Sequence, residues 1–304
     1  MDALQESPQA GRQAFLVLAH EVNSVFTALI QMLDHPETDI FIHMDEKNTS
    51  YNPAETLKLV KYSRIFHTPR IKVSWGAYSQ TEAELILLEA ATSKGHYGHY
   101  HLLSGADLSI KKVNEIIDFF KHHDGEEFVS FRSDTFEHPR WVKYYHLFQE
   151  CSGRRTSPII NGIHKLCILL QMITGVHRNK CINFQKGSQW FSITDEFARY
   201  ILSKRDWISK TFAYTLHSEE IFLQTLTLNS EFINNLYHKE FDDDILSSSM
   251  RLIDWKRKPR PQNSPYTFRV QDLDEIKDSP AMFARKFSPS VDAEIIEKVR
   301  ELYS

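Results

Sequence analysis

The stretch AFLVLAH at residues 14–20 is a continuous apolar run that ends in a polar residue. Such a run predicts a strand buried on both faces, which is typical of a parallel sheet. Asn23 can cap a helix directly after this strand, because its short side chain can accept a hydrogen bond from the first helical turn. Apolar residues then follow at helical spacing, at positions 25, 29, 30 and 33. The run DIFIHMD at 39–45 predicts a second strand, and this strand ends in a carboxylate.

Strands and helices continue to alternate over the first 130 residues. We expect helices at 53–62, 79–92 and 111–122, and strands at 64–68 and 99–104. This order predicts an α/β fold, with a doubly wound, mainly parallel sheet flanked by helices. Ligands of such sheets bind at the carboxyl ends of the strands. The sequence contains neither GxGxxG nor GxxxxGK(S/T), so an ordinary dinucleotide-binding fold and a P-loop enzyme are both disfavoured.

The rest of the chain is less periodic. We expect a short strand followed by a helix capped by Thr194, and further helices at 158–173, 218–228 and 291–303. Residues 256–265 are rich in Pro and positive charge, which is typical of an exposed loop. No repeat or sharp boundary divides the sequence. We therefore expect a single domain over 1–304, with a nucleotide-binding half at 1–130 and an acceptor and catalytic-base half at 131–304.

Composition excludes several classes of protein. A net charge of −4 argues against a general nucleic-acid binder, which usually carries a basic surplus. The three Cys, at positions 151, 167 and 181, form no CxxC pair, so we expect neither a disulfide framework nor a thiolate metal site. Residues 1–8 lack the basic and apolar regions of a signal peptide. Polar residues interrupt the apolar stretch at 159–176, so we expect no transmembrane segment, while peripheral membrane association stays open.

Two motifs contain residues suited to transfer chemistry. Glu219 and Glu220 follow Ser218, which can cap a helix whose first turn favours negative charge. Either carboxylate could instead take a proton from an attacking hydroxyl group, and spacing alone does not choose between them. Arg285 and Lys286 stand between two Phe, and such cations can compensate the charge on a departing diphosphate. In a strand they would point to opposite faces, so at least one must leave the strand to share a ligand.

The acidic triplets offer a poor metal site. Asp242-Asp243-Asp244 lies in a polar stretch and is interpreted as a solvated turn, and Asp272-Leu273-Asp274 as the capped start of a helix. Neither follows a strand of the predicted sheet. Asp107 does follow a strand, but no second carboxylate lies two residues away. The fifteen His form no HExxH motif, so we expect no zinc and no other metal cofactor.

Seven segments, taken in order, resemble the core-2/I-branching β-1,6-N-acetylglucosaminyltransferase family, which includes the peptide O-xylosyltransferases. They are AFLVLAH with DIFIHMDEK, VSWGAYSQTEAELILLEAA, HYHLLSGADLSIK, KGSQWFSITDEFARYIL, SEEIFLQTL, RLIDW with the following SP, and FARKF. The resemblance spans residues 14–287. It implies a GT-A-type fold, a UDP-sugar donor, inversion at the anomeric carbon and no metal requirement.

The resemblance also assigns roles to individual residues. The family's catalytic base falls on Glu220. Arg285 and Lys286 match the family's diphosphate-binding basic pair, and Arg251 is similar to a further phosphate-binding Arg. These four residues would perform the chemistry.

Other matched positions would bind the substrates. Asp45 matches the aspartate near the uracil, with His20, Ser74 and Trp75 on the nucleotide side. The segment from Ser104 to Asp107 would approach the ribose, the pyrophosphate or the donor sugar.

The segment with Ser188, Gln189 and Trp190 would contact the sugar or acceptor. Xylosyltransferase-like members carry an acidic residue where this chain has Gln189, so their donor and acceptor contacts do not carry over to this chain, while the chemistry does. Trp190 is a candidate stacking platform for a sugar ring, and a core position is the alternative interpretation.

The sequence therefore predicts an inverting, metal-independent glycosyltransferase that moves a sugar from a UDP-sugar to a hydroxyl group of a glycan or glycolipid. We expect N-acetylglucosamine as the sugar. Xylosyl, galactosyl or glucuronosyl transfer on the same scaffold, hydrolysis of the nucleotide sugar, and non-catalytic glycan binding are the alternatives. Animal members are membrane-anchored and rich in disulfides, so we expect a cytoplasmic bacterial relative, with the inner face of the membrane as a further possible location.

Overall fold

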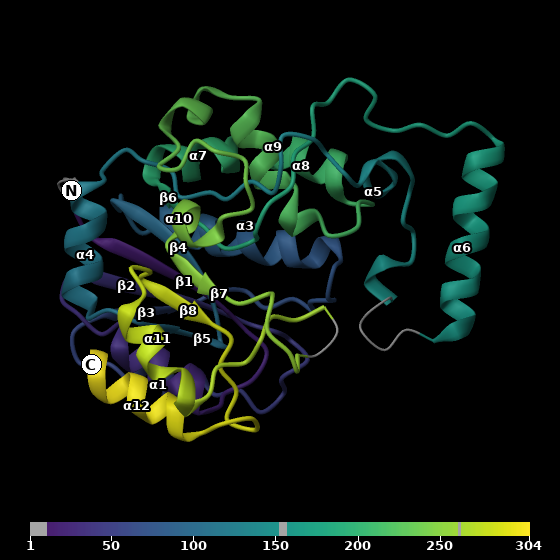
Figure 1. Cartoon of the computed structure of the whole chain (residues 1–304). Coiled ribbons are helices and arrows are strands. Elements are labelled where there is room, and N and C mark those ends of the chain that lie inside the picture. The colour runs from purple at the N-terminus through teal and green to yellow at the C-terminus, as the bar shows by residue number, and fades with distance from the viewer. Residues whose placement is uncertain (1–10, 152–156, 261–262) are drawn as a thin grey trace, which may run out of the picture.

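The protein is described by a computed structural model that covers residues 11–151, 157–260 and 263–304 (Figure 1). Its main sheet has five strands in the order β3-β2-β1-β4-β6. Their bounds are β1 Gln13–Ala19, β2 Thr38–Met44, β3 Arg64–His67, β4 His99–Ser104 and β6 Ser192–Thr194. β1 pairs in parallel with β2 and β4, β2 pairs in parallel with β3, and β6 alone runs antiparallel. The predicted α/β fold with a mainly parallel sheet is confirmed.

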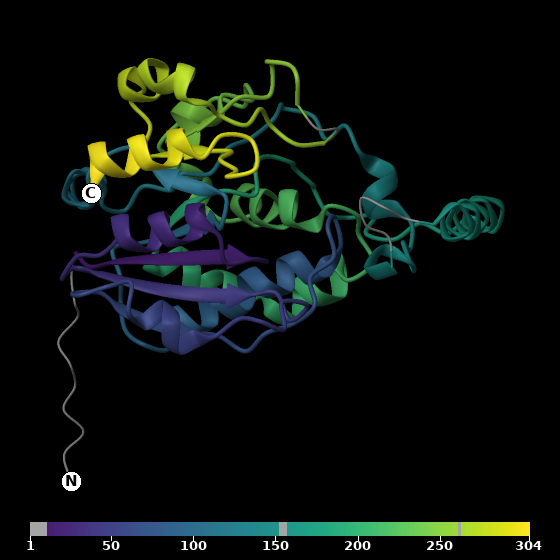
Figure 2. The ribbon, with the colours of Figure 1, turned by 90° about the horizontal axis from the view of Figure 1, so that it is seen from below.

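Helices cover both faces of this sheet (Figure 2). Phe15 and Val17 of β1 pack into a cluster with α1 (Ser24–Met32) and α12 (Glu294–Tyr303). Ala14 and Leu16 point to the other face, where α3 (Tyr78–Thr92) and α7 (Asp195–Ser203) pack. Alternating residues of one strand thus enter two hydrophobic cores, because successive strand side chains point to opposite faces. This arrangement confirms the doubly wound sheet.

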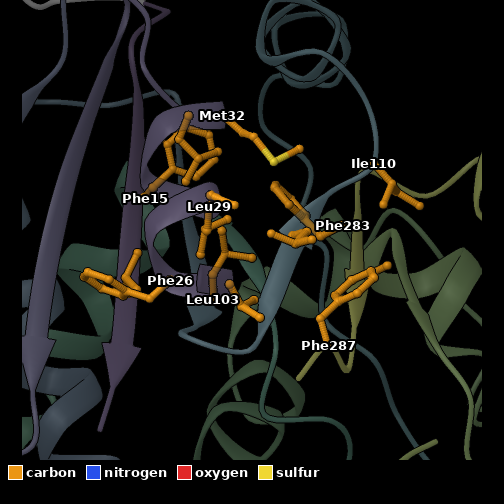
Figure 3. Packing of buried hydrophobic residues seen from close by; sticks show 14 of the residues in the cluster. Phe15, Phe26, Leu29, Met32, Leu103, Ile110, Phe283 and Phe287 are labelled. Carbon is orange, nitrogen blue, oxygen red and sulfur yellow. The ribbon is translucent and has the colours of Figure 1, made fainter. Parts of the chain in front are cut away.

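A second sheet of three strands lies on the side of α1. Its order is β5-β8-β7, with bounds β5 Asp107–Ser109, β7 Arg251–Ile253 and β8 Phe283–Arg285. Phe283 of β8 packs edge-on against Phe15 of β1, with ring centroids 6.2 Å apart. Figure 3 shows Phe283 beside Met32 of α1, and Phe287 belongs to the same cluster. The small sheet is therefore fixed to the main one through the apolar core.

The remaining helices are short, with two exceptions. The longer ones are α4 (Val113–His122) and α6 (Pro158–Ile173). The short α-helices are α2 Pro53–Leu57, α5 Pro139–Lys143, α8 Arg205–Phe212, α9 Phe222–Leu228, α10 Ile245–Ser249 and α11 Leu273–Asp278. Four 3₁₀ turns complete the described elements: η1 Gln149–Cys151, η2 Ser218–Glu220, η3 Glu231–Asn235 and η4 Val270–Asp272.

Most predicted helix boundaries agree with the structure, and two caps are confirmed. Asn23 accepts a hydrogen bond from the backbone nitrogen of Phe26, and Thr194 accepts one from that of Phe197. The helix predicted at 53–62 ends at residue 57, and that at 291–303 begins at residue 294.

The helix predicted at 218–228 is divided into η2 and α9. Ser218 does not cap it, because its hydroxyl group is hydrogen-bonded to that of Thr81, 2.8 Å away. The turn begins instead after His217, whose backbone has the left-handed conformation with φ 50°.

α6 lies at one edge of the molecule and projects from it (Figures 1 and 2). It is the longest described helix, with 16 residues, and none of its side chains is buried. Within the described ranges, we find no helix whose length and apolar character would let it cross a membrane.

Candidate active site

A cavity of about 630 Å³ opens beyond the carboxyl edge of the main sheet. Its walls include Trp75, the segment Lys186–Trp190, the segment around Glu220, and Arg285 with Lys286. Residue 190 lies toward this edge because the antiparallel β6 begins at Ser192, opposite His101, and the preceding Phe191 already accepts from the nitrogen of Leu102. The cavity thus lies where ligands of doubly wound sheets bind.

Glu220 enters the cavity from the last position of η2. Its Oε2 lies 2.7 Å from Nζ of Lys186, and the Lys186 side chain is only 12% exposed. The backbones of the two segments are joined as well, since the nitrogen of Gly187 donates to the carbonyl oxygen of Glu220 at 3.0 Å. The carboxylate therefore has a fixed position and a charged partner.

Glu219 has a different environment from its neighbour. Its side chain is buried, Oε1 lies 3.6 Å from Nδ1 of His217, and burial raises its pKa even though His217 opposes the shift. Burial acts to lower the pKa of His217, but the hydrogen bond and charge of Glu219 raise it overall. The His217 ring packs against Trp75 and Trp141, at centroid distances of 5.0 and 4.7 Å. These contacts hold the η2 turn in place.

Arg285 and Lys286 both line the cavity, although they are adjacent in sequence. β8 ends at Arg285, so Lys286 lies outside the strand, as a shared ligand requires. Nε of Arg285 lies 3.6 Å from Oδ1 of Asp107, its pairing partner across β5 and β8. The Arg285 guanidinium also stacks on the Trp190 ring, 3.8 Å from its centroid. These two contacts hold the guanidinium at the cavity wall.

The segment from Lys186 to Trp190 approaches the neighbouring backbone closely. A Cβ at Gly187 would overlap the carbonyl oxygen of Ser130, so only glycine fits there. The nitrogen of Ser188 donates to the Ser130 hydroxyl group at 2.9 Å. Gln189 Nε2 donates to Oε1 of Glu84 at 2.8 Å. Burial raises the pKa of Glu84 well above its usual value, although the bond from Gln189 opposes the shift.

Aromatic residues are concentrated at this cavity. Four of the five Trp in the chain line it: Trp75, Trp141, Trp190 and Trp255. Trp side chains offer flat apolar faces together with an N–H donor, which suits the binding of sugar rings. The structure gives the Trp190 ring a partner within the protein, the Arg285 guanidinium.

The residues predicted on the nucleotide side lie along the edge of the sheet, outside the cavity lining. His20 follows β1 and is exposed, whereas the Asp45 side chain after β2 is nearly buried. Oδ1 of Asp45 accepts from the nitrogen of Lys47 at 2.9 Å, and Nζ of Lys47 donates to the carbonyl oxygen of Val73 at 2.6 Å. Ser74 donates from its hydroxyl group to the carbonyl oxygen of Glu150 at 2.7 Å. Only the adjoining Trp75 reaches the cavity itself.

Asp107 and Arg251 also lie away from the cavity lining. Asp107 accepts from both the nitrogen and the hydroxyl group of Ser104, each at 2.8 Å, and faces Arg285. The Arg251 guanidinium is buried and donates to the carbonyl oxygens of Leu102 and Phe191. Arg251 therefore joins the small sheet to the main sheet, and the structure does not bring it to the cavity where the other cations gather. The sequence shows that residue 251 carries a charge, but not that its side chain points into the core.

The acidic triplets agree only in part with the prediction: Asp242 and Asp243 are exposed, as expected of a solvated turn, but Asp243 also lines the cavity. Asp244 accepts from the nitrogen of Ser247 and caps α10, while Asp272 accepts from the nitrogen of Arg269 at the start of η4. Across residues 11–151, 157–260 and 263–304, no group of three or more His, Cys, Asp or Glu side chains could hold a metal ion. Cys151, Cys167 and Cys181 have free thiols.

The family model for the Core-2/I-Branching enzyme matches residues 13–277, which include β1, Glu220 and Arg251. The chain belongs to the Core-2/I-Branching enzyme family. It therefore carries a glycosyltransferase domain, and the resemblance inferred from the seven sequence segments is confirmed.

Curated relatives extend this comparison. The chain is 24% identical to xylosyltransferase 2 of Rattus norvegicus over 317 residues, which covers 94% of this chain and 33% of the rat protein. It is 23% identical to xylosyltransferase oxt of Drosophila melanogaster, over 90% of this chain and 31% of the fly protein. The chain thus spans about a third of the length of these relatives. A crystal structure of mouse xyloside xylosyltransferase 1 in its apo form aligns with 90% of this chain and 96% of its own, at 9% identity and a TM-score of 0.39.

Sequence reasoning missed three charged residues of the cavity. Lys186 pairs with Glu220, and Arg132 and Asp243 line the wall near it. Lys186 is the first residue of the KGSQW segment, so its position next to Gly187 could have identified it as a site residue. Nothing in the local sequence marks Arg132, whose nearest cavity neighbours come from distant parts of the chain.

Proposed function

We propose that this chain is an inverting glycosyltransferase that uses a UDP-sugar as donor and Glu220 as its general base. The observation that carries the proposal is the meeting, in one cavity, of the Glu220 carboxylate with Arg285 and Lys286. A carboxylate held near a cationic wall suits a reaction in which a proton is removed on one side and negative charge develops on the other.

The proposed reaction is a single in-line displacement. The oxygen of an acceptor hydroxyl group attacks C1 of the donor sugar, and Glu220 takes the hydroxyl proton. The bond from C1 to the β-phosphate oxygen breaks, and its electron pair leaves with UDP. Because attack and departure occur on opposite faces of the sugar, the anomeric configuration inverts.

Arg285 and Lys286 would stabilise the charge that develops on the β-phosphate. Preorganised cations in a site that excludes water can lower a barrier by several kcal/mol, roughly 3 to 4 for a single donor. Asp107 and Trp190 fix the Arg285 guanidinium before substrate arrives, so little reorganisation is needed. These contacts support a positioning role for Asp107.

The same arrangement supports metal-independent transfer. Cationic side chains supply charge compensation that a divalent ion provides in other transferases. We therefore expect full activity in excess EDTA. Strict dependence on Mn²⁺ or Mg²⁺ would contradict this part of the proposal.

The identities of the sugar and of its acceptor are the most detailed part of the proposal. We expect N-acetylglucosamine transfer to a glycan or glycolipid hydroxyl group, with the uridine along the edge formed by His20, Asp45 and Ser74. Xylose is the second candidate, because the curated relatives are named xylosyltransferases. Parallel assays with UDP-N-acetylglucosamine and UDP-xylose distinguish the two donors.

Glu220→Gln provides the central test. It should abolish transfer, because the amide cannot accept the proton, while leaving UDP affinity in calorimetry nearly unchanged. Glu55→Gln is the matched control, since it also removes a Glu–Lys pair, here an exposed one with Lys58 at 2.7 Å. Retained turnover in Glu220→Gln would refute the assignment of the base. A wild-type chain that binds a glycan but no UDP would instead support the non-catalytic alternative.

A further inference from the structure

The solvent-facing side of α6 is an apolar stripe. Ile159, Ile163, Leu166, Leu170 and Ile173 recur at intervals of three or four residues, so they share one face of the helix. All five are exposed, from 44% at Ile163 to 74% at Ile159. Soluble surfaces rarely expose an apolar stripe as continuous as this, and such a stripe marks an interaction site.

The opposite side of α6 is attached to the body of the protein. His146 Nδ1 and His164 Nε2 lie 3.0 Å apart. Gln171 accepts from the nitrogen of Tyr145 at 2.7 Å and donates to its carbonyl oxygen at 3.0 Å. These contacts fix the rotation of the helix, so the apolar stripe faces outward.

The charge around the helix indicates what the stripe contacts. Residues 138–151 and 157–181 contain five Lys or Arg and a single acidic residue, although the whole chain has a net charge of −4. The one acidic residue, Glu150, is held by hydrogen bonds from the nitrogen and the hydroxyl group of Ser79, at 2.9 and 2.7 Å. The region is therefore basic: Lys143 ends α5, Lys165 lies on α6, and Lys180 follows the end of α6 by seven residues.

The length of α6 determines how it can meet a lipid bilayer. Sixteen residues span about 24 Å as an α-helix, less than the hydrocarbon core of about 30 Å. Interfacial helices lie in the plane of the membrane with an apolar face among the acyl chains and cations near the headgroups. α6 has the apolar stripe, the basic surroundings and the fixed orientation that this mode requires.

We propose that α6 docks in the plane of an anionic lipid membrane, with the stripe from Ile159 to Ile173 inserted below the headgroups. Charge complementarity favours this occupant over a second copy of the chain. Two copies joined through α6 would place two basic regions side by side, whereas anionic lipids attract both cations and apolar residues.

Vesicle flotation of the full chain tests this inference. The wild type should float with phosphatidylcholine vesicles that contain phosphatidylglycerol, and bind less to vesicles of phosphatidylcholine alone. The double variant Leu166→Gln/Leu170→Gln should partition at least about tenfold more weakly, because two inserted side chains become polar. Leu57→Gln is the matched control, since Leu57 of α2 is 50% exposed and lies outside the stripe.

A charge series completes the experiment. Lys165→Glu/Lys180→Glu should weaken binding to anionic vesicles but not to neutral ones, and Lys58→Glu should leave both unchanged. Failure of the wild type to bind anionic vesicles, or full binding by Leu166→Gln/Leu170→Gln, would overturn the proposal. A wild-type dimer in analytical ultracentrifugation that this double variant dissociates would assign the stripe to a second copy instead. UDP binding, measured separately, does not depend on these outcomes.

Discussion

Nζ of Lys186 lies 2.7 Å from Oε2 of Glu220, inside the cavity that also contains Arg285 and Lys286. Exposed ion pairs contribute little because water screens them, but this lysine is largely enclosed. The pair also holds the carboxylate in one orientation, which a general base needs before its substrate arrives. We therefore expect Lys186 to act as a positioning residue for Glu220, the proposed base.

Lys186→Met should lower kcat roughly tenfold to a hundredfold, less than the loss of the base itself. The carboxylate would lose its fixed partner, while the residues on the nucleotide side stay in place. UDP affinity in calorimetry should change little. Lys186→Arg should recover part of kcat, because a cation returns to the same segment.

Lys58→Met is the matched control, since it breaks an exposed Lys–Glu pair on α2 and should leave kcat unchanged. Equal losses of activity in Lys58→Met and Lys186→Met would point to a general effect on the fold. A rise in KM without any fall in kcat would contradict the positioning role.

Asp107→Asn should weaken UDP binding about tenfold, which corresponds to roughly 1.4 kcal/mol. Asp107 holds the Arg285 side chain at 3.6 Å, and the neutral amide attracts a guanidinium less strongly. Uridine, which lacks phosphates, should bind the variant and the wild type equally well. Asp274→Asn is the control, since that carboxylate is exposed and pairs only with Lys277 among the ion pairs of the described chain. Equal weakening of uridine binding would refute a role through the diphosphate.

The sequence was informative where structure depends on local periodicity. The run at 14–20 and the alternation after it predicted four strands of the main sheet, because each strand is defined by its own residues. The small sheet was not predicted. Its strands have three residues each, and β5 pairs with β8 across most of the chain. Such short strands are stabilised by pairing with segments that are distant in sequence, and no local sequence pattern reveals that pairing.

The candidate site divides in a similar way. Glu220, Arg285 and Lys286 were identified through the family resemblance, and the structure brings all three to one cavity. Lys186 was missed because its contact with Glu220 is a matter of three-dimensional position. Arg251 was expected at a phosphate, but its guanidinium points into the core. A sequence shows which charges are present, while packing decides where each one points.

Gly187→Ala should destabilise the fold by roughly 2 to 4 kcal/mol, in the range of substitutions that force a backbone to move. The added Cβ would overlap the Ser130 carbonyl oxygen, so the segment from Lys186 to Trp190 must shift. Urea unfolding measures the loss, and kcat should fall with it. Gly162→Ala is the control, because nothing lies within 4 Å of that position in α6. A stable, fully active Gly187→Ala would show that the close approach has no functional value.

Arg251→Met should destabilise the chain by roughly 2 to 4 kcal/mol, because buried carbonyl oxygens would lose their donor. The affected partners include Leu102 of β4 and Phe191 beside β6, so the attachment of the small sheet should weaken. Below the unfolding transition, UDP affinity should stay near the wild-type value. Arg300→Met, which removes an exposed pair with Glu297, should cost almost nothing. A selective loss of UDP affinity without loss of stability would restore Arg251 as a phosphate ligand.

His99 should make the fold sensitive to acid. Its side chain is fully buried on β4, and Nε2 lies 3.0 Å from the carbonyl oxygen of Glu126, to which it donates. Burial lowers its pKa to about 4, against about 6.5 in an unfolded chain. Between these values the unfolded state binds more protons, so the free energy of unfolding falls as the pH falls. This single group should remove about 3 kcal/mol of stability between pH 7 and pH 4.

His99→Gln should therefore lose about 3 kcal/mol less than the wild type over this range, because Gln can still donate to Glu126 but does not titrate. Buried His101 and His146, whose pKa values are also lowered by burial, would still contribute in both proteins. The test is the difference between the two slopes in urea unfolding at pH 4 to 7. His122→Gln, on the exposed end of α4, is the control and should keep the wild-type slope. Identical slopes for His99→Gln and the wild type would mean that His99 is protonated, or accessible to water, in the folded protein.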